Sequence, residues 1–156
     1  MTIQINRESP LQNDVRSMVG ELNAYMIPLS PREFQFQLSV EEMDKEDISV
    51  FVARAIDGKA VGMGSLKIHD ELIGEVKRMF TIPEVRGQGV GRLLVNAIEA
   101  QARADGLIRI VLETGATKGF EPAWRIYERC GYQQCAAVLD YPDSGYSRFY
   151  EKNLDD

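Results

Sequence analysis

Three glycines at every second position form a short loop in the middle of the chain. The loop reads Arg86, Gly87, Gln88, Gly89, Val90, Gly91 and Arg92. A pattern typical of an amphipathic helix follows directly, with Leu94 and Ile98 on its apolar face. Backbone N–H groups at a helix N-terminus lack partners within the helix and carry partial positive charge. Glycines let a ligand approach these groups closely, so the loop is predicted to bind an anion, above all a phosphate.

The spacing of the glycines excludes the two commonest phosphate-binding motifs. The dinucleotide fingerprint G-x-G-x-x-G needs a third glycine, but this position holds Arg92 when counted from Gly87 and Leu94 when counted from Gly89. The P-loop pattern G-x-x-x-x-G-K-[ST] occurs nowhere in the sequence. The phosphate ligand therefore belongs to another class, and a flexible loop without a ligand is the alternative.

A strand, a helix and a second strand are predicted to position this loop. Residues 74–82 read as a strand, residues 89–104 as a helix that ends before Gly106, and residues 107–114 as a buried strand. Such a crossover places its two strands close together and parallel. The loop then lies at the carboxyl end of a strand, where open α/β sheets bind their ligands.

The remaining elements complete one layered α/β domain over residues 1–156. Strands are predicted at 2–6, 48–55, 61–68, 132–138 and 147–154, and helices at 10–26, 31–43 and 120–130. The pair Asp57-Gly58 marks a hairpin turn between two of the strands. The order β-α-α-β-β-β-α-β-α-β-β predicts a mixed sheet flanked by about four helices.

The composition favours a soluble globular protein. Of 156 residues, 44% are hydrophobic and 27% are charged, and the net charge is −6. An acidic chain is a poor nucleic-acid binder, and the apolar runs are too short to span a membrane. No signal peptide is recognised, so a cytoplasmic location is expected. Cys130, Cys135 and the single histidine, His69, have no metal-ligand spacing, so no metal site is expected.

Several segments resemble the GNAT superfamily of acyl-CoA-dependent N-acetyltransferases. RGQGVG fits the family pattern Q/R-x-x-G-x-G/A, and the stretch from VKRMFTIPE to IRIVLETG resembles the central strand, pyrophosphate loop, helix and next strand of the family. AWRIYERCGY is similar to the following helix, with its A-x-x-x-Y-x-x-x-G-[FY] signature, and YSRFYEKNL to the closing strand. The resemblance extends over residues 48–154, and before them only the order of elements agrees.

This resemblance implies a mostly antiparallel sheet whose central pair of strands splays apart beside a bulge. The pyrophosphate of coenzyme A is then expected on the loop from Arg86 to Arg92. The pantetheine arm of acetyl-CoA is expected along the backbone of Met79, Phe80 and Thr81, because splayed strands leave N–H and C=O groups unpaired. A backbone N–H near Phe80 is also the expected donor that polarises the thioester carbonyl.

The resemblance also implies the catalytic groups. Tyr127 matches the tyrosine that protonates the departing thiolate, although its spacing also suits a core residue of an amphipathic helix. Glu75 matches a catalytic glutamate of some members. It precedes Met79 by four residues, so the two side chains are expected on one face of the strand, about 13 Å apart. Glu75 would then act as a base through water. Glu113 or a chain of water molecules is the alternative base, and Glu75 would otherwise be an exposed strand residue.

One position departs from the family pattern. Members often have Asn or Gln three residues before the alanine of the helix signature, and this chain has Phe120 there. A contact to the pantetheine or phosphate arm is therefore expected to be missing or to be replaced, for example by Lys118.

The resemblance and the loop together predict an N-acetyltransferase that moves acetyl directly from acetyl-CoA to a primary amine of a small molecule in a ternary complex. Acetylation of a peptide or protein amine is one alternative, and a non-catalytic acyl-CoA sensor is another. Aromatic and apolar candidates for contact with the acceptor are Tyr25, Met26, Phe34, Phe36, Tyr141 and Tyr146. Members of the family often dimerise through the closing strands, so a homodimer is a further possibility for this chain.

Overall fold

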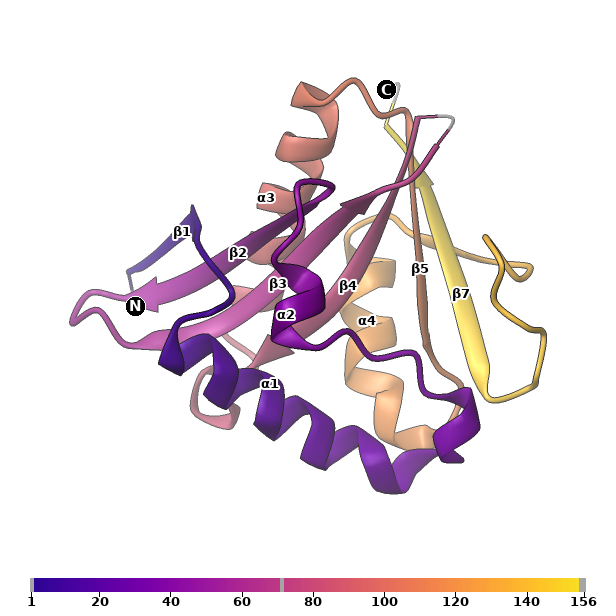
Figure 1. The fold of residues 1–156 in the computed structure, drawn as a ribbon, viewed down its shortest axis with the longest axis horizontal. Coiled ribbons are helices and arrows are strands. Elements are labelled where there is room, and N and C mark those ends of the chain that lie inside the picture. The colour runs from indigo at the N-terminus through magenta and orange to yellow at the C-terminus, as the bar shows by residue number, and fades with distance from the viewer. Residues whose placement is uncertain (1, 71, 155–156) are drawn as a thin grey trace.

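A seven-stranded mixed sheet forms the centre of the computed structural model, which describes residues 2–70 and 72–154 (Figure 1). The strand order is β1-β2-β3-β4-β5-β7-β6. The strands are β1 (Ile3–Arg7), β2 (Ile48–Ala55), β3 (Ala60–Ile68), β4 (Ile73–Thr81), β5 (Arg109–Gly115), β6 (Gln133–Cys135) and β7 (Ser147–Asn153). All neighbours are antiparallel except β4 and β5, which are parallel. The predicted fold class is confirmed.

Helices cover both faces of the sheet (Figure 1). α1 (Asn13–Met26) and the short α2 (Val40–Met43) lie on one face, and α3 (Val90–Ala104) and α4 (Glu121–Arg129) lie on the other. Each long helix turns one apolar stripe to the sheet, because its buried residues recur at intervals of three and four. In α1 these residues are Val15, Met18, Val19 and Leu22. In α3 they include Val90, Leu94, Ile98 and Ala102.

The parallel pair of β4 and β5 forms a fork. β4 pairs with β5 only over Ile73–Val76, opposite Arg109–Leu112. Beyond this stretch the two strands diverge, while β4 stays paired with β3 as far as Thr81. The fork thus opens at the carboxyl ends of both strands, next to the glycine loop, and the predicted splay is confirmed.

A one-residue bulge in β4 lies opposite Gly64 of β3. Arg78 and Met79 together face this single residue, because the register shifts between Met63 and Ser65. Arg78 has a φ of 56°, in the left-handed region that an arginine seldom adopts. The bulge therefore has a defined conformation, and it re-aims the side chains that follow it.

The bulge reverses which side chains share a face of β4. Glu75 and Phe80 both oppose odd-numbered residues of β3, so they share the face covered by α1 and α2. Met79 lies on the opposite face, where its Sδ and Ile98 Cδ1 are the atoms closest to a Cβ placed on Gly64. The expectation that Glu75 and Met79 share one face is wrong, because strand alternation fails at a bulge.

The segment after α1 differs most from the sequence prediction. A single 3₁₀ turn, Ile27–Leu29, follows α1. The helix expected at 31–43 is replaced by a second such turn, Arg32–Phe34, by extended chain, and then by α2. Pro28 and Pro31 interrupt helical hydrogen bonding here. Apolar residues then recur at every second position, which suits extended chain: Phe34, Phe36, Leu38 and Val40.

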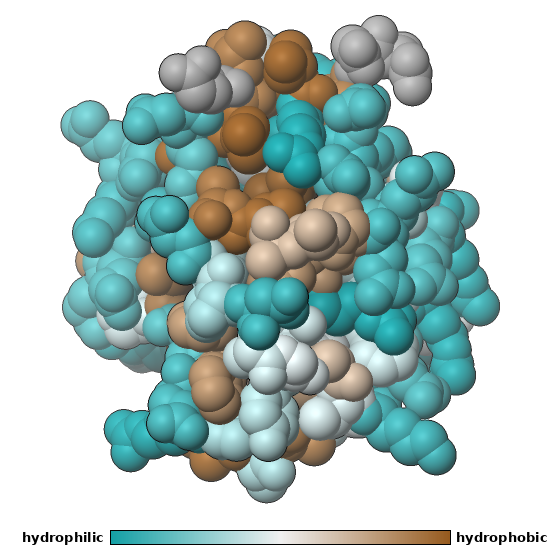
Figure 2. Space-filling model, turned by 90° about the vertical axis from the view of Figure 1, so that its right-hand side faces the viewer, coloured by the Kyte–Doolittle hydropathy of each residue, from teal (hydrophilic) through white to brown (hydrophobic). Residues whose placement is uncertain are grey.

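Apolar residues also reach the surface on the side of the molecule that carries β7 (Figure 2). A second, smaller hydrophobic cluster joins β5, β7 and the chain between β6 and β7, and its buried members are Val111, Val138 and Phe149. The strand predicted at 132–138 is limited to β6. Within residues 2–70 and 72–154, no helix combines the length and the apolar character needed to cross a membrane.

Candidate active site

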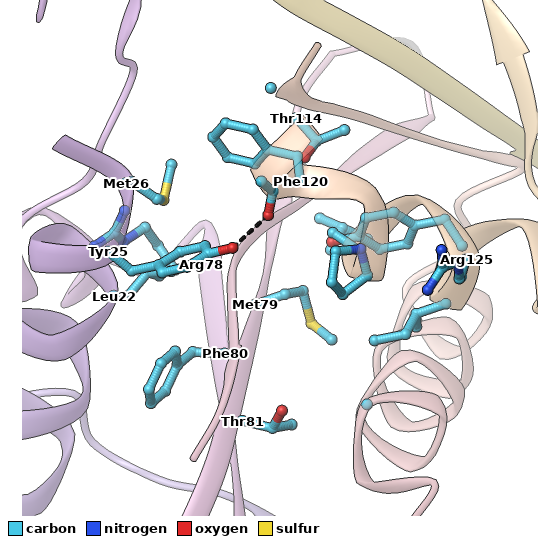
Figure 3. Close-up of a pocket in the computed structure, with 18 of the residues that line it drawn as sticks. Leu22, Tyr25, Met26, Arg78, Met79, Phe80, Thr81, Thr114, Phe120 and Arg125 are labelled. Carbon is cyan, nitrogen blue, oxygen red and sulfur yellow. Dashed lines mark hydrogen bonds between the residues drawn. The ribbon is translucent and has the colours of Figure 1, made fainter. Parts of the chain in front are cut away.

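A pocket of about 780 Å³ opens where β4 and β5 diverge (Figure 3). Its walls come from α1, the chain around Phe34, β4, the glycine loop, β5 and α4. The predicted site residues that line it are Glu75, Met79, Phe80, Thr81, Arg86, Gly87, Gly89, Val90, Gly91, Arg92, Glu113 and Tyr127. Gln88 does not line it, and its Nε2 donates to the carbonyl oxygen of Glu84 at 3.3 Å. One cavity therefore brings together residues from distant parts of the chain.

The three glycines of the loop have different structural roles. Gly87 and Gly89 have φ values of 82° and 85°, and a Cβ on either would meet no atom within 4 Å. Gly91 is helical, and a Cβ there would lie 2.9 Å from Ile126 Cδ1 of α4. Gly87 and Gly89 therefore serve the turn and leave open space above it, whereas Gly91 lets α3 pack against α4.

The N-terminus of α3 presents backbone donors to this open space. The N-cap residue is Gly89, which has no side chain to accept a hydrogen bond. The first backbone bond into the helix runs from Leu93 N to Gly89 O at 3.1 Å. The N–H groups of Val90, Gly91 and Arg92 come before it, so they are available to an anion.

Four arginines line the pocket at the loop end: Arg86, Arg92, Arg125 and Arg129. Arg86 Nε donates to the carbonyl oxygen of Thr81 at 3.1 Å, and its guanidinium lies 5.7 Å from the centre of the Phe80 ring. Arg125 and Arg129, one turn apart on α4, were missed by the sequence reasoning. Both lie within two residues of Tyr127 on the same helix, and this proximity could have indicated them.

Tyr127 projects from α4 toward the fork and is buried. Its ring packs edge-on against Tyr132 at 5.9 Å, and no hydrogen bond to its hydroxyl is found among the residues that the structure describes. Burial raises the pKa of Tyr127 above its ordinary value, with smaller contributions from Cys130 and Glu113. The phenol therefore stays protonated at neutral pH and can act as a donor.

Glu75 lies at the base of the fork on the α1 face and is only 2% exposed. Its Oε1 is 2.8 Å from His69 Nε2. Its Oε2 accepts from Tyr141 Oη at 2.5 Å and from Lys77 Nζ at 3.3 Å. Lys77 Nζ also donates to Tyr141 Oη at 2.6 Å. Both carboxylate oxygens of Glu75 are therefore occupied, and the side chain is not the exposed strand residue that the alternative expected.

Glu113 is the second carboxylate of the pocket and comes from the diverging part of β5. Its Oε2 accepts from Ser147 Oγ at 2.7 Å. Burial raises the pKa of Glu113, and the hydrogen bond from Ser147 and the charge of Lys77 only partly oppose this. Glu113 is therefore a stronger base than an ordinary glutamate once it is ionised.

The α1 side of the pocket carries most of the aromatic residues that the sequence suggested. Tyr25, Met26, Phe34, Phe36 and Tyr146 line it. The rings of Phe34 and Tyr146 stack at 5.1 Å. Tyr25 Oη donates across the pocket to the carbonyl oxygen of Gly119 at 2.5 Å, as Figure 3 shows. The Tyr25 bond joins α1 to the chain before α4, and the stacked rings join the chain after α1 to the residue before β7.

Phe120, at the position where the family often has an amide, also lines the pocket. Its ring covers Gly115, where a Cβ would lie 2.0 Å from Phe120 Cε2. Trp124 Nε1 donates to the carbonyl oxygen of Gly115 at 2.8 Å. Lys118 does not line the pocket. An apolar wall thus takes the place of the expected amide.

The chain matches the family model described as the acetyltransferase (GNAT) family over residues 15–132. This protein belongs to the GNAT family. It is a GNAT-type acetyltransferase, and the fold of this family binds acetyl-CoA. The resemblance inferred from the loop and from the Tyr127 helix is confirmed.

Relatives of this acetyltransferase extend along nearly the whole chain. An "IAA acetyltransferase" of Azospirillum brasilense is 39% identical over 153 residues, which cover 97% of this chain and 98% of that protein. A crystal structure named as an acyl-CoA N-acyltransferase, from Klebsiella pneumoniae, has a TM-score of 0.81 at 30% identity and covers 97% of both chains.

A third comparison involves a structure with the coenzyme. PaiA N-acetyltransferase of Thermoplasma acidophilum, solved in complex with coenzyme A, has a TM-score of 0.73 at 18% identity over 98% of this chain and 99% of that chain. At this level of identity the likeness concerns the fold. It does not identify the acceptor of this acetyltransferase.

Proposed function

We propose that this acetyltransferase moves the acetyl group of acetyl-CoA to the primary amine of a small molecule, directly and within a ternary complex. The observation that carries the proposal is the pocket at the fork, which has the loop and four arginines at one end and two carboxylates at the other. Phosphates suit the first end, and an amine suits the second. The reactants then meet where β4 and β5 diverge.

The coenzyme is proposed to use backbone groups along most of its length. Its pyrophosphate binds the N–H groups at the start of α3, with Arg86 and Arg92 supplying charge. Its pantetheine arm hydrogen bonds to Met79, Phe80 and Thr81, which have no partners on β5. A backbone N–H near Phe80 donates to the thioester carbonyl and stabilises the negative charge that develops on its oxygen.

The transfer needs one base and one acid. The amine nitrogen attacks the thioester carbon, a C–N bond forms and the C–S bond breaks. The amine proton passes to a base, and the departing sulfur accepts a hydrogen bond and a proton from Tyr127. Because burial keeps Tyr127 protonated, its hydroxyl is in the donor form throughout the neutral range.

Two carboxylates compete for the role of base. Glu75, the base predicted from the sequence, has both oxygens engaged by His69, Lys77 and Tyr141. Glu113 accepts from Ser147 on one oxygen only, and burial raises its pKa. These contacts favour Glu113 as the group that receives the proton, with Glu75 holding Lys77 and Tyr141 in position. A water molecule can connect either carboxylate to the amine.

The proposal is tested by titrating acetyl-CoA into the protein in a calorimeter and then following thiol release across a panel of primary amines. Binding together with turnover of a small amine is the expected result. Turnover only with peptide amines would assign the protein to the alternative class. Binding without turnover on small or peptide amines would point to an acyl-CoA sensor, and absence of binding would overturn the assignment of the loop.

A further inference from the structure

Arg78 is a buried cation without an anionic partner. The residue is 7% exposed, and its Nη2 donates to the amide oxygen of Asn23 in α1. Its Nε is buried and has no hydrogen-bond partner. Among the residues that the structure describes, no carboxylate forms an ion pair with Arg78. Among these residues, the guanidinium of Arg78 is therefore hydrogen bonded to a neutral amide and to no negative charge.

Such an arrangement is costly, because the charged form of a buried group is disfavoured without a counter-ion. Burial lowers the pKa of Arg78 to about 10, so the side chain still carries its charge at neutral pH. Arg54 of β2, another arginine of the sheet, is paired with carboxylates instead: it contacts Glu8 and Asp14 at 2.8 Å. Arg78 therefore differs from Arg54, whose charge is balanced by carboxylates of this chain.

Arg78 lines the part of the pocket where the acceptor is expected. The bulge turns its side chain to the α1 side of β4, near Leu22 and Tyr25 (Figure 3). It directly precedes Met79 and Phe80, the proposed site of the thioester. The coenzyme does not supply an anion there, because its pantetheine arm carries no charge and its phosphates are assigned to the loop.

We propose that Arg78 binds a carboxylate of the acceptor, so that the substrate is an amine that also carries a carboxylate, such as an amino acid. This inference rests on the proposed function and names the acceptor class of that site. A guanidinium group binds a carboxylate through short charge-assisted hydrogen bonds. The positively charged ammonium group of the acceptor then faces Glu75 and Glu113. Both ends of a zwitterion are matched.

The first experiment compares each of the twenty common amino acids with its carboxamide, which keeps the amine and removes the negative charge. The measurement is kcat/KM from thiol release at saturating acetyl-CoA. For the acids that are used, we expect kcat/KM to exceed that of the matched amide about 10- to 100-fold, the usual range for hydrogen bonds to a charged group. Equal values for acid and amide would overturn the inference and leave the proposed function intact.

The second experiment gives Arg78 an internal partner without removing it. Asn23→Asp replaces the amide by a carboxylate of nearly the same shape, which competes with the acceptor for the guanidinium. The ratio of acid to amide is expected to fall at least about tenfold. Asn96→Asp makes the same change of charge at an exposed position of α3 and is the matched control. An unchanged ratio in Asn23→Asp would contradict the inference.

Arg78→Met removes the charge and is expected to bring the ratio close to one, with acetyl-CoA binding as the check on folding. A binding measurement separates the two hypotheses if no amine is acetylated. N-acetyl amino acids and their amides are then titrated into the protein saturated with coenzyme A. Acid-selective binding that Asn23→Asp abolishes would support the role of Arg78 while the transfer hypothesis fails. Binding without this selectivity, or no binding, would overturn both.

Discussion

The two ends of the pocket are built by different means. The loop end uses consecutive backbone N–H groups with Arg86 and Arg92 of the same segment, and α4 adds Arg125 and Arg129. The fork end uses side chains that other segments hold: Glu75 of β4 contacts His69 and Tyr141, and Glu113 of β5 contacts Ser147. The backbone donors of the loop end therefore depend on local conformation, whereas the fork end depends on tertiary contacts. Substitutions at the loop end should therefore weaken coenzyme binding, and substitutions at the fork end should slow the transfer step.

The largest effect is expected at the loop end, from Gly89→Val. The new side chain must adopt a φ near 85° and enters the space proposed for the pyrophosphate, so acetyl-CoA affinity should fall at least about 100-fold, as expected when two charge-assisted hydrogen bonds are lost. Calorimetry measures the loss. Gly58→Val, at a φ of 88° in the hairpin between β2 and β3, imposes the same strain far from the pocket. Equal losses in both variants would contradict a phosphate site.

The next effect is expected from Tyr127→Phe. Removal of the hydroxyl should lower kcat about 100-fold, the lower range for a general acid, while the Kd of acetyl-CoA stays near that of the wild type. Tyr132→Phe is the control, since its buried hydroxyl has no partner among the described residues and lies next to the Tyr127 ring. A parallel loss of kcat and affinity in Tyr127→Phe would indicate a packing role.

The comparison of the two carboxylates identifies the base. Glu113→Gln should lower kcat/KM about 100-fold with little change in folding. In the wild type, the acidic limb of kcat/KM should lie above the pKa of an ordinary glutamate, because burial raises the pKa of Glu113. Glu75→Gln breaks the contacts of a nearly inaccessible carboxylate and should cost about 2 kcal/mol of unfolding free energy. An acidic limb that survives in Glu113→Gln would transfer the role to Glu75.

The smallest effect is a difference in stability that depends on pH. The pKa of Glu113 is higher in the folded protein than in the unfolded chain, so the folded state binds the proton more tightly. Glu113→Gln should therefore gain stability relative to the wild type as pH rises through the folded-state pKa, and this gain should vanish below the unfolded-state value. Thermal unfolding from pH 4 to pH 8 measures the difference. An opposite trend would mean that contacts with Lys77 and Ser147 outweigh burial.

The sequence allowed the elements of the central region to be predicted within a residue or two, because strand and helix patterns there are strong. β2 spans residues 48–55 as expected, and α3 begins one residue after the predicted start. The helix predicted at 31–43 after α1 was wrong, although Pro31 suits the first turn of a helix. The extended course of this segment depends on packing against the pocket, where Phe34 stacks on Tyr146.

The sequence by itself determined the loop and its backbone donors, because a glycine loop before a helix sets its own backbone geometry and needs no distant partner. Only the tertiary structure decided which side chains meet at the fork. The bulge at Arg78 changes which side chains of β4 share a face. Its position cannot be predicted from the local sequence, because it depends on how β4 pairs with β3. Burial then raises the pKa of Glu113 and leaves Arg78 without a counter-ion, because both depend on what packs around them.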